Sequence, residues 1–201
     1  MGIINLSPES FYGGSLCQSQ EQALDVAKRM VDEGANFLDI GAESSRPGSA
    51  PLTEQEEIKR LLPAVTNIAR KVKIPISVDT YKPAVAREVL NAGATIINDI
   101  TGLQRFPEMA QVISQFHAGV ILMHMQGTPP SMQDNPAYTN ILTEISDYLR
   151  QSVKVATSAG IDRSKIAIDP GIGFGKTDAH NLKILKNLEH FHEMNLPILL
   201  G

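Results

Sequence analysis

Short apolar segments alternate along the chain with longer segments in which apolar residues recur at helical spacing. The short segments are rich in β-branched residues, are bounded by Gly or Pro, and are too short to be helices. They predict buried parallel strands at residues 2–5, 37–40, 76–79, 95–99, 119–124, 166–169 and 197–200. The longer segments predict amphipathic helices at residues 20–33, 54–71, 83–91, 107–116, 139–159 and 179–191. Three of these helices are expected to stop at a glycine: Gly34, Gly93 and Gly160.

This alternation predicts parallel β/α units, arranged either as a closed eight-unit barrel or as an open doubly wound sheet. Polar side chains at or just past the C-terminal ends of the predicted strands favour the barrel. They are Asn5, Asp39 with Glu43, Asp79, Asn98 with Asp99, His124 and Asp169. A barrel brings all strand ends to one mouth, whereas an open sheet gathers only those near its switch point. We therefore predict a (β/α)8 TIM barrel.

The number of units is smaller than a complete barrel needs. The chain holds six complete units plus the seventh strand in 201 residues, against eight units in about 250 residues for a typical barrel. It also begins at one predicted strand and ends just after another. We therefore expect residues 1–201 to form a single barrel domain that is truncated at both ends.

Composition narrows the class of protein. Hydrophobic residues make up 42% and charged residues 20%, with a mean hydropathy of -0.08, which suits a folded domain with a full core. No apolar run reaches the roughly 18 residues of a membrane span. A single cysteine, Cys17, cannot form an internal disulfide, which favours a reducing, cytoplasmic location. A net charge of -4 gives no general attraction to nucleic acid, so local groups must hold any anionic ligand.

The richest motif is DPGIGFGK at residues 169–176, between a predicted strand and a helix. A Walker A loop needs glycine where Pro170 stands, and the dinucleotide fingerprint that would start at Gly171 needs glycine where Lys176 stands. Both are excluded. What remains is a glycine-rich loop that can approach a flat ligand, with Asp169 at its base and Phe174 placed to stack. The alternative is a tight turn with a capping Asp.

Two other loops follow predicted strands. In GAESSRPG at residues 41–48, Arg46 with neighbouring hydroxyls suits a carboxylate or a phosphate, although a solvated loop arginine is also possible. In NLSPESFYGG at residues 5–14, Asn5 is a candidate contact for a metal or phosphate, and Phe11 is a candidate lid or ligand contact rather than core.

Asp79 and Asn98 end neighbouring predicted strands and form a donor and acceptor pair inside the barrel mouth. A buried carboxylate there is either hydrogen-bonded within the protein or available to ligand N–H groups. His124, between two methionines, is as consistent with a satisfied core histidine as with a functional one. No cysteine or serine arrangement indicates a nucleophilic triad.

Taken together, the segments MGIINLSPESF, DIGAESSRPG, SVDT, AGATIINDITG, LMHMQG and DPGIGFGK resemble the dihydropteroate synthases of the pterin-binding barrel family. They occur in that family's order along the whole chain. The family's Ser-Arg-Lys motif after strand 7 and Arg-x-His stretch after strand 8 are absent, in agreement with the expected truncation. Ser45 stands where the family commonly has threonine, and Glu9 where it has aspartate, so the hydroxyl and the charge are kept.

The resemblance implies a reaction and a set of site residues. The reaction joins 6-hydroxymethyl-7,8-dihydropterin diphosphate to p-aminobenzoate in folate biosynthesis, with sulfonamides competing as benzoate mimics. The catalytic and pterin-binding groups would be Asp79, Asn98 and Asp169, with apolar pocket walls from Ile100, Met123 and Phe174. The diphosphate and benzoate half would use Asn5, Phe11, Ser45, Arg46 and Pro47. Asn5 would contact Mg²⁺, and the full-length protein would be a homodimer.

Elementary chemistry supports that mechanism. Loss of diphosphate leaves positive charge on a methylene attached to an electron-rich dihydropterin, which a carboxylate such as Asp79 can stabilise, while Asn5, Mg²⁺ and Arg46 suit the leaving group. A related methyltransferase acting on methyltetrahydrofolate and a corrinoid should lack the ESSRPG and SPESF loops that are present here. A catalytically silent pterin-binding paralogue remains an alternative.

Overall fold

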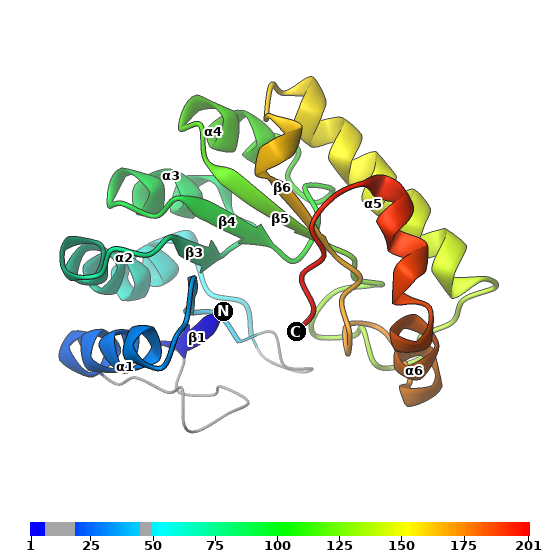
Figure 1. Ribbon diagram of the computed structural model, residues 1–201, viewed down its shortest axis with the longest axis horizontal. Coiled ribbons are helices and arrows are strands. Elements are labelled where there is room, and N and C mark those ends of the chain that lie inside the picture. Colours follow the sequence, from blue (N-terminus) through cyan, green and yellow to red (C-terminus); the bar gives the residue numbers. More distant parts are fainter. Residues whose placement is uncertain (7–18, 45–49) are drawn as a thin grey trace.

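The computed structural model of the chain describes residues 1–6, 19–44 and 50–201. Six parallel strands form one curved sheet with the order β1-β2-β3-β4-β5-β6, and helices lie along its outer side (Figure 1). The strands are β1 (Gly2–Asn5), β2 (Leu38–Gly41), β3 (Ile76–Asp79), β4 (Ile96–Asp99), β5 (Gly119–Met123) and β6 (Ile166–Asp169). Strand order follows chain order without the reversal that defines a doubly wound sheet, so the choice of a barrel arrangement is confirmed.

The helices are α1 (Gln20–Asp32), α2 (Glu54–Lys71), α3 (Pro83–Asn91), α4 (Met109–Gln115), α5 (Ile141–Ser158) and α6 (Asp178–Lys186), with short 3-10 helices η2 (Arg163–Lys165) and η3 (Leu188–Met194). The predicted stops are confirmed, since Gly34, Gly93 and Gly160 adopt φ of 98°, 112° and 92°. Local capping starts α2, where the Thr53 hydroxyl accepts from the Glu56 N–H and the Glu56 carboxylate accepts from the Thr53 N–H.

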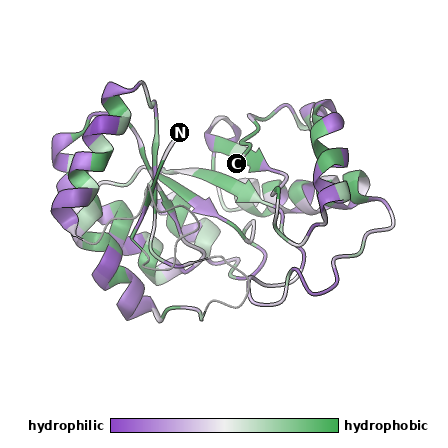
Figure 2. Cartoon of the chain, turned by 90° about the horizontal axis from the view of Figure 1, so that it is seen from below, coloured by the Kyte–Doolittle hydropathy of each residue, from purple (hydrophilic) through white to green (hydrophobic). Residues whose placement is uncertain are grey.

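The sheet and the inner faces of the helices share one apolar core, and Figure 2 shows largely hydrophobic strands flanked by helices whose outer faces are hydrophilic. Ile4, Leu38, Val78, Ile97 and Leu122 are fully buried strand residues of this core. Such rigid packing fixes the positions of the strand ends, on which the candidate site depends.

Two predicted elements differ in extent. The segment predicted as a seventh strand lies parallel to β6, but it forms only one bridge, between Ile168 and Ile198. The helix predicted at residues 179–191 divides at Asn187 into α6 and η3. There the Asn187 side chain donates to the Lys183 carbonyl at 2.8 Å, which ends the helix by capping one of its last carbonyls.

Over the described part of the chain, none of the helices has the combination of length and apolar character that crossing a bilayer requires.

Candidate functional site

The register of the sheet brings Asn5, Asp79 and Asn98 to one level, and Asp169 lies two residues further toward the carboxyl edge. Asn5 pairs with Gly41, Gly41 with Asp79, and Asp79 with Asn98, while Met123 pairs with Asp169. Carboxyl ends of parallel strands are where β/α folds place their ligands. Asn5, Asp79, Asn98 and Asp169 therefore share one edge of the sheet, as the sequence predicts.

Alternation along the strands decides which polar residues face this site. Asn98 Nδ2 donates to Asp39 Oδ2 at 3.3 Å, so these side chains meet inside the sheet. The adjacent Asp99 is buried elsewhere. Its carboxylate accepts from the Thr101 N–H and hydroxyl and from the Leu103 N–H, which holds the turn after β4. Asp99 is thus a structural group.

The inner cluster, formed by Asp39, Ser77 and Asn98, contains buried polar atoms that could form further hydrogen bonds. Within the described residues, Asp39 Oδ1, Asn98 Oδ1 and Ser77 Oγ are buried without a hydrogen-bond partner. An unsatisfied buried polar atom costs about 1–3 kcal/mol. Such atoms at a strand-end site indicate a ligand that supplies N–H or O–H donors.

Two members of this cluster, Ser77 and Asp39, are not among the site residues that the sequence predicts, and Asp39 is the charged one. The available signal was its position two residues before Gly41 in an otherwise apolar strand, which puts its side chain on the same side of the sheet as the site. Burial raises the pKa of Asp39. Burial, followed by the charge of Asp39, raises the pKa of Asp79 well above its usual range. A donor-rich ligand would relieve this accumulation of negative charge.

Asp169 has a different environment at the end of β6. Its Oδ1 accepts from the Gly171 N–H at 2.7 Å. Burial raises the pKa of Asp169 to about 6, against the lowering effects of that hydrogen bond and of Lys176. At neutral pH the side chain is therefore mostly a carboxylate, ready to accept from a ligand.

The predicted apolar walls come together beside these carboxylates. Ile100 and Met123 belong to a small buried cluster separate from the main core, and Phe174 packs against it. The other members are Tyr81, Met125 and Met132, with Phe106 at the edge. Flat apolar contacts next to carboxylate and amide acceptors suit a planar heterocycle with N–H donors.

The loop after β6 packs directly on the backbone that follows β5. Gly171 has φ of 70°, and a Cβ there would lie 2.0 Å from the His124 carbonyl oxygen; at Gly175, with φ of 65°, it would lie 2.4 Å from the Gln126 carbonyl oxygen. Glycine is required at both positions because no side chain fits.

Gly171→Ala should therefore destabilise the protein much more than Gly173→Ala. Gly173 has a similar φ of 82° but nothing within 4 Å of its Cβ position, so alanine there carries only the backbone strain of about 1–2 kcal/mol. We expect Gly171→Ala to cost at least about 2 kcal/mol more, because the His124 backbone must shift. Urea denaturation of both variants measures the difference; equal losses would contradict the packing described.

Asn5 and Asp79 lie on the two strands that flank Gly41 of β2. Gly41 stands between them, and a Cβ on it would lie 3.6 Å from Asp79 Oδ2 and 3.9 Å from Asn5 Oδ1. Both atoms are oxygens of the kind that Mg²⁺ prefers as ligands. The described residues hold no group of three or more His, Cys, Asp or Glu side chains that could bind a metal. The Asn5 and Asp79 oxygens suit a Mg²⁺ ion that is bound mainly through substrate phosphates.

Four predicted site residues, Phe11, Ser45, Arg46 and Pro47, lie outside the described residues.

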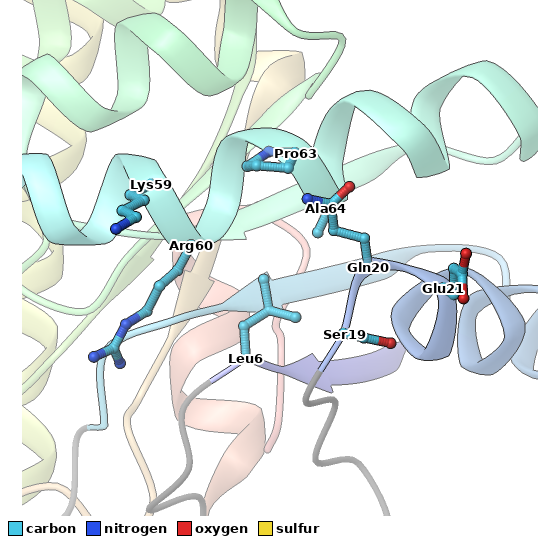
Figure 3. Close-up of a pocket in the computed structure, with 8 residues that line it drawn as sticks. All are labelled: Leu6, Ser19, Gln20, Glu21, Lys59, Arg60, Pro63 and Ala64. Atoms are coloured by element: carbon cyan, nitrogen blue, oxygen red, sulfur yellow. The ribbon is translucent and has the colours of Figure 1, made fainter.

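A cavity of about 490 Å³ is distinct from the strand-end site (Figure 3). It lies beside α1 and α2 and is lined by Leu6, Ser19, Gln20, Glu21, Lys59, Arg60, Pro63 and Ala64. None of these residues is among those that the sequence analysis assigns to pterin binding.

Comparison with known proteins decides the family. All of the chain, residues 1–201, matches the family described as "Pterin binding enzyme". The chain belongs to the pterin-binding enzyme family. Among curated members, dihydropteroate synthase of Bacillus subtilis is 43% identical and that of Escherichia coli K12 is 42% identical over 201 residues. These matches cover 100% of this chain and 68% and 71% of those relatives.

Solved structures of dihydropteroate synthases support the same family assignment. Yersinia pestis dihydropteroate synthase, solved as a sulfonamide drug complex, superposes with a TM-score of 0.96 at 43% identity, covering 100% of this chain and 73% of that one. The Xanthomonas albilineans enzyme in complex with 7,8-dihydropteroate gives a TM-score of 0.85 at 35% identity, covering 100% and 71%. The resemblance seen in the sequence and the TIM-barrel class are both confirmed.

Proposed function

We propose that the protein is a dihydropteroate synthase. It transfers the pterinylmethyl group of 6-hydroxymethyl-7,8-dihydropterin diphosphate to the amine of p-aminobenzoate, giving 7,8-dihydropteroate and diphosphate in folate biosynthesis. The observation that supports this most is the inner cluster of Asp39, Ser77 and Asn98, in which Asp39 Oδ1, Ser77 Oγ and Asn98 Oδ1 are buried without a hydrogen-bond partner among the described residues. The family relationship supplies the same activity independently.

The pterin ring would lie between the carboxylates and the apolar wall. Asp169 would accept from the 2-amino group and a ring N–H, since a carboxylate matches a guanidine-like edge. Asn98 and Asp79 would bind the opposite edge, with Ile100, Met123 and Phe174 as the apolar contacts. These assignments rest on the position of Asp79, Asn98 and Asp169 at the carboxyl ends of their strands and on the unpartnered Oδ1 of Asn98.

In the chemical step, the bond between the methylene carbon and the diphosphate oxygen breaks and a bond from the benzoate nitrogen to that carbon forms. The amine then loses one proton. Asp79 would stabilise the positive charge that develops on the pterin and its methylene carbon. No side-chain nucleophile is needed.

The leaving group needs positive charge and hydrogen-bond donors. We assign Asn5, Phe11, Ser45, Arg46 and Pro47 to the diphosphate and benzoate half of the site. Asn5 would hold Mg²⁺, which when bound would supply positive charge for the leaving diphosphate. Arg46 suits a carboxylate or phosphate because its planar fork donates paired hydrogen bonds.

The direct test is to incubate the purified protein with the pterin diphosphate, Mg²⁺ and labelled p-aminobenzoate. We expect labelled 7,8-dihydropteroate, with inhibition by a sulfonamide that competes with p-aminobenzoate. Pterin binding without product would indicate the silent paralogue. Methyl transfer from methyltetrahydrofolate to a corrinoid would indicate the methyltransferase.

Arg46→Ala should separate the two halves of the site. We expect turnover and sulfonamide binding to weaken by about tenfold or more, since a charge-assisted pair contributes about 1.5–3 kcal/mol, while binding of an isolated pterin stays nearly unchanged. Calorimetry with each ligand measures both. Equal loss of both ligands would instead indicate that the barrel mouth is misfolded.

We further propose that residues 1–201 belong to a single barrel domain of a cytoplasmic homodimer that binds neither nucleic acid nor membrane. The acidic balance of the sequence and its single cysteine support this location and these partners. Light scattering of the purified protein tests the dimer.

A further inference from the structure

A buried ion cluster joins three elements near the carboxyl edge of the sheet. It consists of Lys82 at the start of α3, Glu57 of α2, and Glu43, which follows β2. Lys82 Nζ donates to Glu43 Oε2 and to Glu57 Oε2. The side chains of Lys82, Glu43 and Glu57 are only 9%, 13% and 2% exposed. Apolar residues of similar volume often replace a buried ion pair without loss of stability, so stability alone does not account for this cluster.

The Glu43 carboxylate holds both ends of the loop between β2 and α2. Its Oε1 accepts from the Tyr81 hydroxyl at 2.7 Å, and its Oε2 accepts from Lys82 and from the Leu52 N–H at 2.8 Å. Glu43 begins this loop, and Leu52 lies just before α2. Between them the sequence contains three of the residues that we assign to the diphosphate and benzoate half: Ser45, Arg46 and Pro47.

The same cluster borders the pterin half of the site. Tyr81 and Lys82 follow Asp79 by two and three residues. A small cavity of about 10 Å³ separates the cluster from the strand end, and it is lined by Glu43, Glu57, Asp79, Thr80, Tyr81 and Ile100. The Tyr81 ring belongs to the small apolar cluster that contains Ile100. The segment that carries Asp79 and the loop that begins at Glu43 are therefore joined through buried side chains.

We propose that Glu43 and Lys82 are positioning residues that fix the two halves of the site relative to each other. Their ion pair ties the segment after Asp79, in the pterin half, to the loop ends at Glu43 and Leu52, in the diphosphate and benzoate half. This role rests on the proposed function, because the benzoate nitrogen must lie about 3–3.5 Å from the pterin methylene carbon before they react. Neither residue needs to touch a ligand.

Glu43→Gln keeps the side-chain volume but leaves only one acceptor oxygen, so Tyr81, Lys82 and Leu52 cannot all keep their hydrogen bonds. We expect kcat/KM for p-aminobenzoate to fall about 10²-fold, chiefly through a higher KM, since a misplacement of about 1 Å can cost that much. Sulfonamide affinity should fall with it. Affinity for an isolated pterin should stay nearly unchanged, because Asp79 keeps its place on β3.

Lys82→Met removes the other partner of the pair, and it should give the same split between p-aminobenzoate and pterin. The double variant with Glu43→Gln should be no worse than the more impaired single variant, because both changes break one interaction. Additive losses would show that the two residues act separately and would contradict a shared positioning role.

Two control variants separate positioning from surface charge and from stability. Glu88→Gln makes the same exchange at an exposed position of α3 and should keep every wild-type value. Ile145→Val removes a methyl group from a fully buried position of α5, so it should lower the melting temperature without changing the KM for p-aminobenzoate. If Glu43→Gln behaved like Ile145→Val, or if it lost pterin affinity equally, the proposal would be overturned.

Hydrogen exchange tests the tie itself without any ligand. Because the Leu52 N–H donates to Glu43, its exchange should be slow in the wild type and at least about tenfold faster in Glu43→Ala, while the amides of β4 keep their protection. Unchanged exchange at Leu52 would overturn the proposal. If the wild type made no dihydropteroate, the proposed function would fail, and Leu52 exchange would still decide whether Glu43 holds the two loop ends.

Discussion

Asp169→Asn should weaken binding of 6-hydroxymethylpterin by about 10²–10³-fold, which corresponds to about 3–4 kcal/mol. In the wild type, one carboxylate oxygen accepts from the Gly171 N–H at 2.7 Å, and the other makes no hydrogen bond to any described residue. An asparagine that keeps the Gly171 contact must turn its NH₂ toward the pterin donors. Two donors then face each other in a buried site, where the penalty is largest.

Calorimetry with the pterin alone measures this effect without the chemical step. Asp147→Asn is the matched control, because Asp147 is exposed and pairs only with Arg150 three residues along α5, a contact of little energetic weight. Its affinity should equal that of the wild type. If Asp169→Asn also bound normally, Asp169 would be only the cap of a βα turn, which is the alternative that the sequence leaves open.

The sequence predicts the sheet well because each strand is an apolar run between clear breakers, and because glycine occurs where helices must stop. It predicts less well where pairing depends on long-range geometry. Nothing local distinguishes the run at residues 197–200 from the other strands, yet it forms a single bridge to β6. The break at Asn187 is likewise decided by one side chain that caps its own helix.

For the candidate site, the sequence predicts which residues lie at the strand ends, but it does not predict what each of their side chains contacts. Adjacent Asn98 and Asp99 look equivalent in sequence, but their side chains lie on opposite faces of β4, so one meets Asp39 and the other holds a turn. The partnership of Lys176 with His124 joins residues 52 positions apart, and the motif gives no sign that its lysine is buried. Only the packing of the two loops brings that pair together.

Asp79→Asn should lower turnover by about 10²–10³-fold, the typical loss for one preorganised electrostatic group. The same change should leave the melting temperature unchanged or slightly higher. Asp79 is half-buried close to Asp39, and an amide removes both the desolvation of a charge and the like-charge repulsion that raise the pKa of Asp79. If Asp79 served only stability, the same substitution would leave turnover normal and lower the melting temperature.

Steady-state kinetics and thermal denaturation of the same preparation measure both effects. The expected pattern is a large fall in kcat with a folded, stable protein, because the Asp79 charge contributes most when the methylene becomes cationic. Pterin affinity should fall less than turnover, since Asn98 and Asp169 still bind the ring. A variant that lost affinity and turnover equally would place Asp79 in ground-state binding only, and the charge that stabilises the transition state would have to come from another group, with Asp39 the nearest carboxylate on the neighbouring strand.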